Sequence, residues 1–355
     1  MFHLVGVRAV LSHDPAQSAS APPRLPRDRL LLYRNRSGKL REATSRAQWL
    51  RRRADIILGF EKIAGPLPGR ERRCPLDLQV EDEFDAGTYV RRAVSYQAEP
   101  GGRVPAYLLI PKSGLAGKKC PAALCLHQTH AAGRKVVVGL GNSPDDEYGV
   151  ELARRGFVCL APPYPLLADY NPDLFRLGYA SGTMKAIWDN IRGLDLLESL
   201  PFVRREAVVA IGHSLGGHNA IFTAVMEPRI KVVVTSCAFD SFVDYMGGNI
   251  SGWNQVRYMP RLKDYIGRPA DIPFDFHELV GALAPRGLFV NAPTGDSNFR
   301  WQSVDRIASA AQPVYALYHA EKHLVVRHPE CQHRFPPELR QEAYTFMDAQ
   351  LAALR

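Results

Sequence analysis

The chain has 355 residues, of which 46% are hydrophobic and 23% are charged. These proportions are close to globular averages, so the disordered, collagen-like and disulfide-scaffold classes are excluded. No stretch approaches the ~18 consecutive apolar residues that a membrane span requires, and we expect no membrane partner. The six cysteines form no Cys-x-x-Cys pair, which argues against a zinc module and favours small buried hydrophobic residues.

The net charge of +9 is concentrated near the N-terminus. Residues 1–92 carry 16 Arg and 2 Lys against 11 acidic residues, so +7 of the charge lies there. A basic segment can attract nucleic acid, anionic lipid or an acidic polymer. The clusters Arg51-Arg52-Arg53 and Arg70 to Arg73 lack the regular aromatic interleaving of a nucleic-acid platform. We therefore interpret them as solvated helix faces and expect no nucleic-acid partner.

The first part of the chain has the composition of a tail followed by a helical extension. Residues 1–28 are rich in Ala, Ser, Pro and Arg, and we expect them to be poorly ordered. Their short apolar stretch is interrupted by Arg8 and follows no basic region, which favours an untargeted, cytoplasmic protein over a secreted one with a cleaved signal peptide. Residues 29–75 form the extension, whose helix is predicted from Ser45 to Ile63.

Residues 76–355 have the pattern of a single α/β domain. Three predicted strands form an antiparallel lead-in: Leu76–Phe84, Tyr89–Tyr96 and Val104–Ile110. From Pro121 onward, short apolar strands alternate with helices, and these strands are Ala122–Leu126, Phe157–Ala161, Ala207–Ile211, Ile230–Ser236, Gly287–Asn291 and Val314–Tyr318. Continuous apolar strands between amphipathic helices predict a mostly parallel sheet covered by helices on both faces.

The strongest chemical signal is the segment Gly212-His-Ser-Leu-Gly-Gly217, which lies between a predicted strand and a predicted helix. A serine on such a sharp turn has a strained backbone, and glycines two residues away on each side remove the resulting clash. The hydroxyl then stands clear of the sheet, and the N-terminus of the following helix favours a developing oxyanion. We interpret Ser214 as a nucleophile rather than as part of an ordinary tight turn.

A serine nucleophile requires a base and an orienting acid, which follow it in the order Ser, Asp or Glu, His in folds of this type. His333 lies in a loop between the last predicted strand and the terminal helix. We prefer it as the base over its neighbours His323 and His328, because the base belongs in that loop.

The acid is predicted to be Asp296, five residues after the strand that ends at Asn291. An Asp in a Gly-containing turn also commonly caps the next helix, which is the purely structural interpretation. Asp240 is the competing acid, because it follows the strand that ends at Ser236.

The segment His127-Gln-Thr-His130 follows the first strand of the parallel part, where many lipases carry His-Gly-Gly-Gly. We assign the oxyanion-hole donors to the backbone N–H groups of Leu215 and Gln128, with Thr129 as the alternate for the second. The two histidines of this loop have no third ligand at a fitting spacing, so we predict neither a metal site nor a cofactor.

These motifs resemble those of serine members of the α/β-hydrolase superfamily, within the dienelactone hydrolase and acetyl xylan esterase-like group. The resemblance extends from about residue 76 to the end and rests on Leu126-His-Gln-Thr129, Leu152-Ala-Arg-Arg-Gly156, Gly212-His-Ser-Leu-Gly-Gly217, Ala292-Pro-Thr-Gly-Asp296 and His333-Arg-Phe-Pro336. It implies an α/β-hydrolase fold. True dienelactone hydrolases have a cysteine where Ser214 stands, so their substrate is not implied, and the oxyanion loop lacks paired glycines.

The connection between the strands that end at Ser236 and begin at Gly287 is 50 residues long, far longer than an ordinary one. We expect residues 237–285 to form a small cap whose Trp253 and Tyr258 contact the substrate. The alternative is that the aromatic residues of the cap only pack it onto the core. Polar residues interspersed among them predict a preference for short-acyl esters.

The sequence therefore predicts a serine carboxylic ester hydrolase that acts on a small-molecule or oligosaccharide ester through an acyl-enzyme intermediate. One alternative is a peptidase similar to prolyl oligopeptidases, but such enzymes carry a propeller or a large gating domain, for which residues 1–75 are too short. A non-catalytic binding protein with a hydrolase fold is the other alternative. The sequence predicts neither the natural ester nor the oligomeric state.

Overall fold

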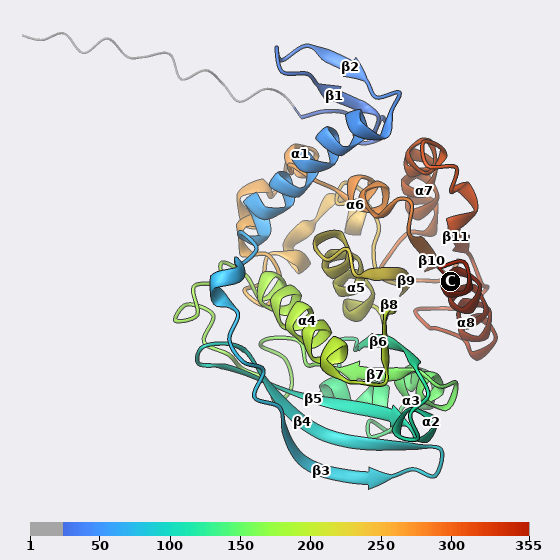
Figure 1. The fold of residues 1–355 in the computed structure, drawn as a ribbon. Coiled ribbons are helices and arrows are strands. Elements are labelled where there is room, and N and C mark those ends of the chain that lie inside the picture. The colour runs from blue at the N-terminus through green and yellow to red at the C-terminus, as the bar shows by residue number, and fades with distance from the viewer. Residues whose placement is uncertain (1–23, 355) are drawn as a thin grey trace, which may run out of the picture.

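The structure of the protein is a computed structural model that describes residues 24–354, and a nine-stranded mixed sheet lies at its centre (Figure 1). Its strands are β3 (Gln79–Asp85), β4 (Tyr89–Glu99), β5 (Gly102–Pro111), β6 (Cys120–Leu126), β7 (Val158–Ala161), β8 (Val203–His213), β9 (Ile230–Ser236), β10 (Gly287–Asn291) and β11 (Leu324–Arg327). They lie in the order β11-β10-β9-β8-β6-β7-β5-β4-β3. The strands from β11 to β7 run parallel, and β5, β4 and β3 form an antiparallel edge. The predicted α/β fold class is confirmed.

Helices cover both faces of this sheet. The helices are α2 (Lys112–Leu115), α3 (Tyr148–Arg154), α4 (Gly182–Ser199), α5 (Leu215–Met226), α6 (Phe276–Leu283), α7 (Trp301–Ala316) and α8 (Pro337–Ala352). Side chains of α4, α5, α6 and α7 share one buried cluster with the sheet, whereas α3 and α8 share a second cluster on the opposite face. Within the described part of the chain, we find no helix that is both long and apolar enough to cross a membrane.

The N-terminal extension packs onto the main core. It contains a hairpin of β1 (Leu32–Arg34) and β2 (Leu40–Glu42), followed by α1 (Arg46–Ala64), which lies outside α6 (Figure 1). The predicted helix is confirmed, and Ser45 caps it by accepting a hydrogen bond from the N–H of Gln48. Trp49 and Phe60 are fully buried in the cluster that also contains α4 and α5. Of the predicted tail 1–28, residues 1–23 lie outside the described part.

The predicted last strand, Val314–Tyr318, is wrong. Val314 and Tyr315 belong to the end of α7, and the last strand of the sheet is β11. A short apolar run cannot be distinguished from a buried helical turn by its apolarity alone. The buried residues Val304, Ile307, Ala311 and Val314 recur every three or four positions, which is the helical spacing.

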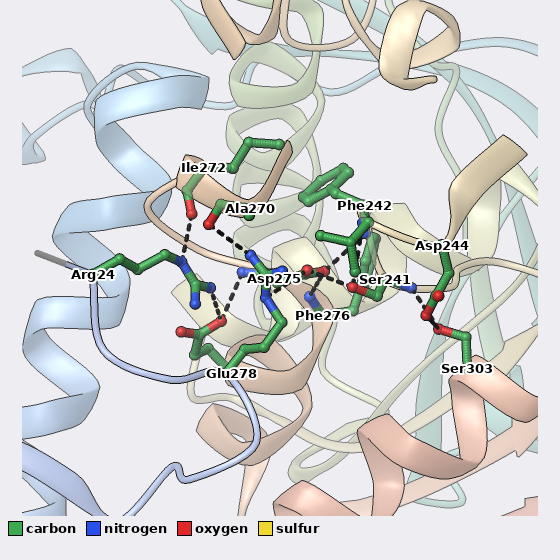
Figure 2. A network of polar contacts seen from close by, with 12 residues as sticks. Arg24, Ser241, Phe242, Asp244, Ala270, Ile272, Asp275, Phe276, Glu278 and Ser303 are labelled. Carbon is green, nitrogen blue, oxygen red and sulfur yellow. Dashed lines mark hydrogen bonds and ion pairs between the residues drawn. The ribbon is translucent and has the colours of Figure 1, made fainter. Parts of the chain in front are cut away.

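The cap begins after β9 as a series of short 3-10 turns and ends at α6. The predicted cap range 237–285 thus includes α6, which packs against α5 and α7 as part of the helical layer. Asp275, the N-cap residue of α6, connects this helix to the turns at the start of the cap. Its carboxylate accepts hydrogen bonds from the Ser241 hydroxyl, at 2.7 Å, and from the backbone N–H of Phe242, at 3.2 Å (Figure 2).

Basic residues of the N-terminal segment 24–75 contact the base of the cap, and the ion pairs of Arg24 and Arg27 correct the prediction that residues 24–28 belong to a poorly ordered tail. Arg24 lies 2.7 Å from the carboxylate of Glu278 in α6, and Arg52 of α1 lies 3.1 Å from its other oxygen (Figure 2 shows the Arg24 pair). Arg27 lies 3.2 Å from Asp275. Part of the basic charge of the extension therefore faces buried carboxylates at the base of the cap, which corrects the prediction that Arg52 belongs to a solvated face.

Candidate active site

Ser214 stands on the sharp turn between β8 and α5. Its backbone has φ 51° and ψ −120°, a conformation that L residues rarely adopt. A β-carbon at Gly212 would lie 2.2 Å from the carbonyl of Gly216, and one at Gly216 would lie 1.8 Å from the carbonyl oxygen of Leu126 on β6. The two glycines therefore permit the turn, as the sequence pattern predicts. The turn is fixed by the N–H of Ser214, which donates to the carbonyl of Ser236 at 2.7 Å.

Asp296 and His333 are brought together by two loops that pair along their backbones. The N–H groups of Thr294 and Gly295 donate to the carbonyls of Pro329 and Cys331, both at 3.0 Å. The Nδ1 of His333 then lies 3.0 Å from each carboxylate oxygen of Asp296. A carboxylate in this position fixes the tautomer that leaves the Nε2 of His333 free to accept a proton.

The electrostatics of Asp296 agree with this pairing. Burial alone raises the pKa of its carboxyl, but hydrogen bonds from His333 and from the N–H groups of Asn298 and Phe299 outweigh burial and bring the pKa below its usual value. Asp296 is thus ionised at neutral pH, as an orienting acid must be.

The rival residues have other partners. Asp240 accepts a hydrogen bond from the N–H of Arg300 at the start of α7, and burial raises the pKa of Asp240 to about 7. His328 bonds the carbonyl of Ala292 and the carboxylate of Asp305, whereas His323 bonds the carbonyl of Pro285 before the start of β10, at the amino ends of the parallel strands and away from Ser214. Among these candidates, the structure pairs only Asp296 with His333.

The loop after β6 is held by His127. Its Nδ1 donates to the carbonyl of Gln128 at 2.8 Å, and its Nε2 accepts the N–H of Tyr164 at 3.0 Å. Burial lowers the pKa of His127 to about 4, so the ring stays neutral. Gln128 and Leu215 both line the cavity beside Ser214, and Leu215 is the first residue of α5, so its N–H has no acceptor within the helix. Their placement fits the predicted oxyanion donors.

A cavity of about 340 Å³ opens above Ser214, between the loop after β6 and the cap. Its lining includes the predicted contact residues Trp253 and Tyr258 together with Gln128, Thr129, His213, Ser214, Leu215, His218, Tyr245, Gly252, Asn298, Phe299 and His333. Trp253 packs within 6.5 Å, between ring centroids, of both Tyr258 and Phe299. The cavity therefore has aromatic walls, and among its described lining residues there is no Lys, Arg, Asp or Glu.

Cys237 is close to the Asp296–His333 pair. One potential metal-ligating atom from each of these three residues lies within 4.8 Å of the others. Cys237 is buried, which raises the pKa of its thiol well above the usual value, and its Sγ contacts the carbonyl of Arg334 at 3.3 Å. The thiol is thus protonated at neutral pH and packs behind the histidine.

Several residues around the site were not predicted from the sequence. His213, His218, Asn298 and Phe299 line the cavity. Their positions depend on loops far apart in the chain. The sequence signal that could have indicated Asn298 and Phe299 is their closeness to Asp296 in the same turn.

No family model matches the chain. The chain is 25% identical over 267 residues to the Bacillus subtilis protein named "Putative hydrolase YtaP", across 72% of this chain and 85% of that protein. It is 27% identical over 146 residues to the 4-O-methyl-glucuronoyl methylesterase of Hypocrea jecorina, across 36% of this chain and 31% of that protein.

Solved structures share the whole architecture. A glucuronoyl esterase from Solibacter usitatus superposes with a TM-score of 0.73 at 18% identity, covering 92% of this chain and 98% of that chain. A "putative acetyl xylan esterase" from Bacteroides fragilis superposes with a TM-score of 0.61 at 16% identity, covering 90% and 92%. The chain therefore has the α/β-hydrolase fold that the resemblance implies.

Proposed function

We infer that the protein is a serine-dependent hydrolase of carbohydrate esters. The observation that carries this inference is the hydrogen-bonded Asp296–His333 pair, which opens into the same cavity as the strained Ser214. A nucleophile on a sharp turn, a base and an ionised orienting acid are the groups that ester hydrolysis through an acyl-enzyme requires.

In the proposed mechanism, the Oγ of Ser214 attacks the ester carbonyl while the Nε2 of His333 takes the hydroxyl proton. Asp296 stabilises the resulting imidazolium, and the N–H groups of Leu215 and Gln128 stabilise the oxyanion. His333 then protonates the leaving alcohol. Water enters, loses a proton to His333 and attacks the acyl group, which releases the acid and restores Ser214.

The carbohydrate part of the proposal is supported by the relatives and by the cavity. A protein similar in sequence is named a 4-O-methyl-glucuronoyl methylesterase, and a protein similar in fold is named a glucuronoyl esterase. In such an ester the carboxyl is neutral, and the described cavity lining has histidines as its only ionisable groups besides tyrosine. Aromatic side chains such as Trp253 and Tyr258 offer apolar surfaces with polar tips, which suit the faces of a sugar ring.

The proposal is tested with the Ser214→Ala variant and a matched Ser113→Ala variant, whose serine is exposed in α2. The substrates are the methyl ester of glucuronic acid, acetylated xylose and 4-nitrophenyl acetate. We expect wild type and Ser113→Ala to hydrolyse at least one sugar ester, with kcat about 10⁴- to 10⁶-fold lower in Ser214→Ala. A fluorophosphonate should label Ser214. Hydrolysis that survives the Ser214→Ala change would refute the mechanism.

A further inference from the structure

Behind the imidazole of His333, a polar network joins the ends of three adjacent strands. His213, Ser236 and Asn291 are the last residues of β8, β9 and β10, which lie side by side in the sheet (Figure 1). The register pairs Ser236 with His213 on one side and with Asn291 on the other. Residues paired in neighbouring parallel strands point to the same face, so the sheet itself aligns these three side chains.

The three side chains form a continuous chain of hydrogen bonds. The amide nitrogen Nδ2 of Asn291 donates to the Oγ of Ser236 at 2.7 Å, and this hydroxyl shares a hydrogen bond of 2.9 Å with the Nδ1 of His213. All three residues are at least 95% buried. The Oδ1 of Asn291 is buried without a hydrogen-bond partner among the described residues, so the position of this side chain depends on the bonds that its Nδ2 donates. Each of these bonds is strong in a medium of low dielectric constant, and losing one would leave a further unpaired group.

The network also contacts the nucleophile and the loop that carries the base. The carbonyl of Ser236 accepts the N–H of Ser214 at 2.7 Å. The same amide group of Asn291 donates to the carbonyl of Arg334, the residue that follows His333, at 2.9 Å. The buried network therefore fixes the backbone of Ser214, the proposed proton donor, and the backbone next to His333, the proposed acceptor.

His213 completes the enclosure of the base. Its ring lies 4.9 Å from the ring of His333, between centroids, and the ring of Phe299 lies 6.1 Å from His333. Burial, together with the neighbouring His333, lowers the pKa of His213 to about 3, so His213 remains neutral when His333 becomes an imidazolium. A second positive charge at this place would oppose formation of the His333 imidazolium, whereas a neutral ring only restricts the position of His333.

We propose that Asn291, Ser236 and His213 are positioning residues that hold the imidazole of His333 in line with the hydroxyl of Ser214. This inference rests on the proposed ester hydrolysis. None of the three residues needs to touch the substrate carbonyl. Because misplacement by about 1 Å can cost about 100-fold in rate, loosening this network should lower kcat while leaving substrate binding and KM nearly unchanged.

The test compares Asn291→Ala with Asn190→Ala. Asn190 is fully buried between α4 and α5, and its Nδ2 likewise donates two hydrogen bonds, to Asn219 and Thr223. Both variants thus remove the same buried groups, but only Asn291 contacts the network. The measurements are kcat and KM on the ester that wild type hydrolyses, the melting temperature, and the downfield proton resonance of the Asp296–His333 hydrogen bond.

We expect both variants to lose similar thermal stability. Asn291→Ala should lower kcat by roughly 10- to 100-fold with KM within about threefold of wild type, and should broaden the downfield resonance. Asn190→Ala should keep both the wild-type kcat and the resonance. Equal kcat values for the two folded variants, or an unchanged resonance in Asn291→Ala, would overturn the proposal.

Two further arms keep the test decisive. If Asn291→Ala does not fold, Ser236→Ala replaces it, because this change removes the hydroxyl that joins Asn291 to His213 and Ser236 is not among the lining residues of the cavity, so the same two readouts apply. If wild type hydrolyses no ester, the proposed function fails. The resonance still decides whether the network positions His333, since it is measured without turnover.

Discussion

At the scale of single residues, the two candidate acids differ in the partner of their carboxylates. Asp296 contacts His333, whereas Asp240 contacts the backbone of Arg300. Asp296→Asn should therefore mispair the imidazole tautomer and lower kcat on the order of 10⁴-fold near neutral pH, and Asp240→Asn should cost about tenfold or less. The measurement is kcat on one ester under one set of conditions, and the opposite ranking would transfer the role of acid to Asp240.

Asp240 should instead affect how stability depends on pH. Burial raises the pKa of its carboxyl from 3.8 to about 7, so the folded protein holds a proton that the unfolded chain releases. Stability from this group is complete below about pH 4 and is lost as the pH rises toward 7. Asp240→Asn should unfold in urea with a free energy higher than wild type by about 1–3 kcal/mol at pH 8 and nearly equal at pH 4. An equal difference at both pH values would contradict this.

Residues whose role is set by their immediate neighbours could be predicted from the sequence. Ser214 is one, because the glycines that permit its turn lie two positions away on each side. Residues whose role depends on the register between strands could not be predicted from the sequence. His213, Ser236 and Asn291 become neighbours only when β8, β9 and β10 align, and no local pattern marks that alignment.

At the scale of elements, the short turns of the cap limit the room for an acyl chain. Trp253 lines the cavity of about 340 Å³ from the cap, and its indole packs 4.8 Å from the ring of His218 and 5.8 Å from that of Tyr245. We expect kcat/KM for 4-nitrophenyl esters to be higher with acetyl or butyryl than with palmitoyl groups. Trp253→Ala should shift the preference toward longer chains, and Trp301→Ala, outside the lining, should not. A kcat/KM that rises steadily with chain length in wild type would contradict this prediction.

The limits of prediction at this scale follow from length and environment. Long helices such as α1 and the terminal α8 could be predicted because their apolar spacing extends over several turns. The end of α7 was mistaken for a strand because Val314 and Tyr315 are buried in the same cluster as the strands. An apolar run of five residues indicates only that the segment is buried. The secondary structure is indicated by the spacing of the buried residues over the preceding turns of the helix.

A buried ion cluster ties α4 to the antiparallel part of the sheet. The Nζ of Lys185 lies 2.5 Å from Asp189 and 3.1 Å from Glu99 of β4, with all three side chains nearly or fully buried. Lys185→Met should destabilise the protein by about 3–5 kcal/mol in urea unfolding at pH 8, because the buried Asp189 loses the cation it pairs with and Glu99 keeps only Arg72. The loss should be smaller in the triple variant that adds Asp189→Asn and Glu99→Gln, and a larger loss there would argue against an electrostatic cause.

At the scale of the whole molecule, part of the basic charge of the N-terminal segment 24–75 pairs with buried carboxylates of the same chain. The sequence showed the excess of arginine but not its partners, since Glu278 and Asp275 lie more than 180 residues further along the chain. Arg24 contacts Glu278 where the cap joins α6 (Figure 2), and Arg27 contacts Asp275, the N-cap residue of the same helix. The extension and the cap are therefore parts of one folded unit.

The double variant Arg24→Ala, Arg27→Ala should weaken that unit. Glu278 would keep only Arg52, at 3.1 Å, and Asp275 would lose its cation, so we expect a loss of about 2–4 kcal/mol in urea unfolding at pH 8. Burial already raises the pKa of Glu278, and its protonation relieves an unpaired charge, so the loss should shrink toward pH 5. The control is Arg29→Ala, whose exposed pair with Glu42 spans 3.8 Å and should contribute less than about 0.5 kcal/mol. Equal losses in the two variants would mean that the buried pairs at the base of the cap contribute no more than a surface contact.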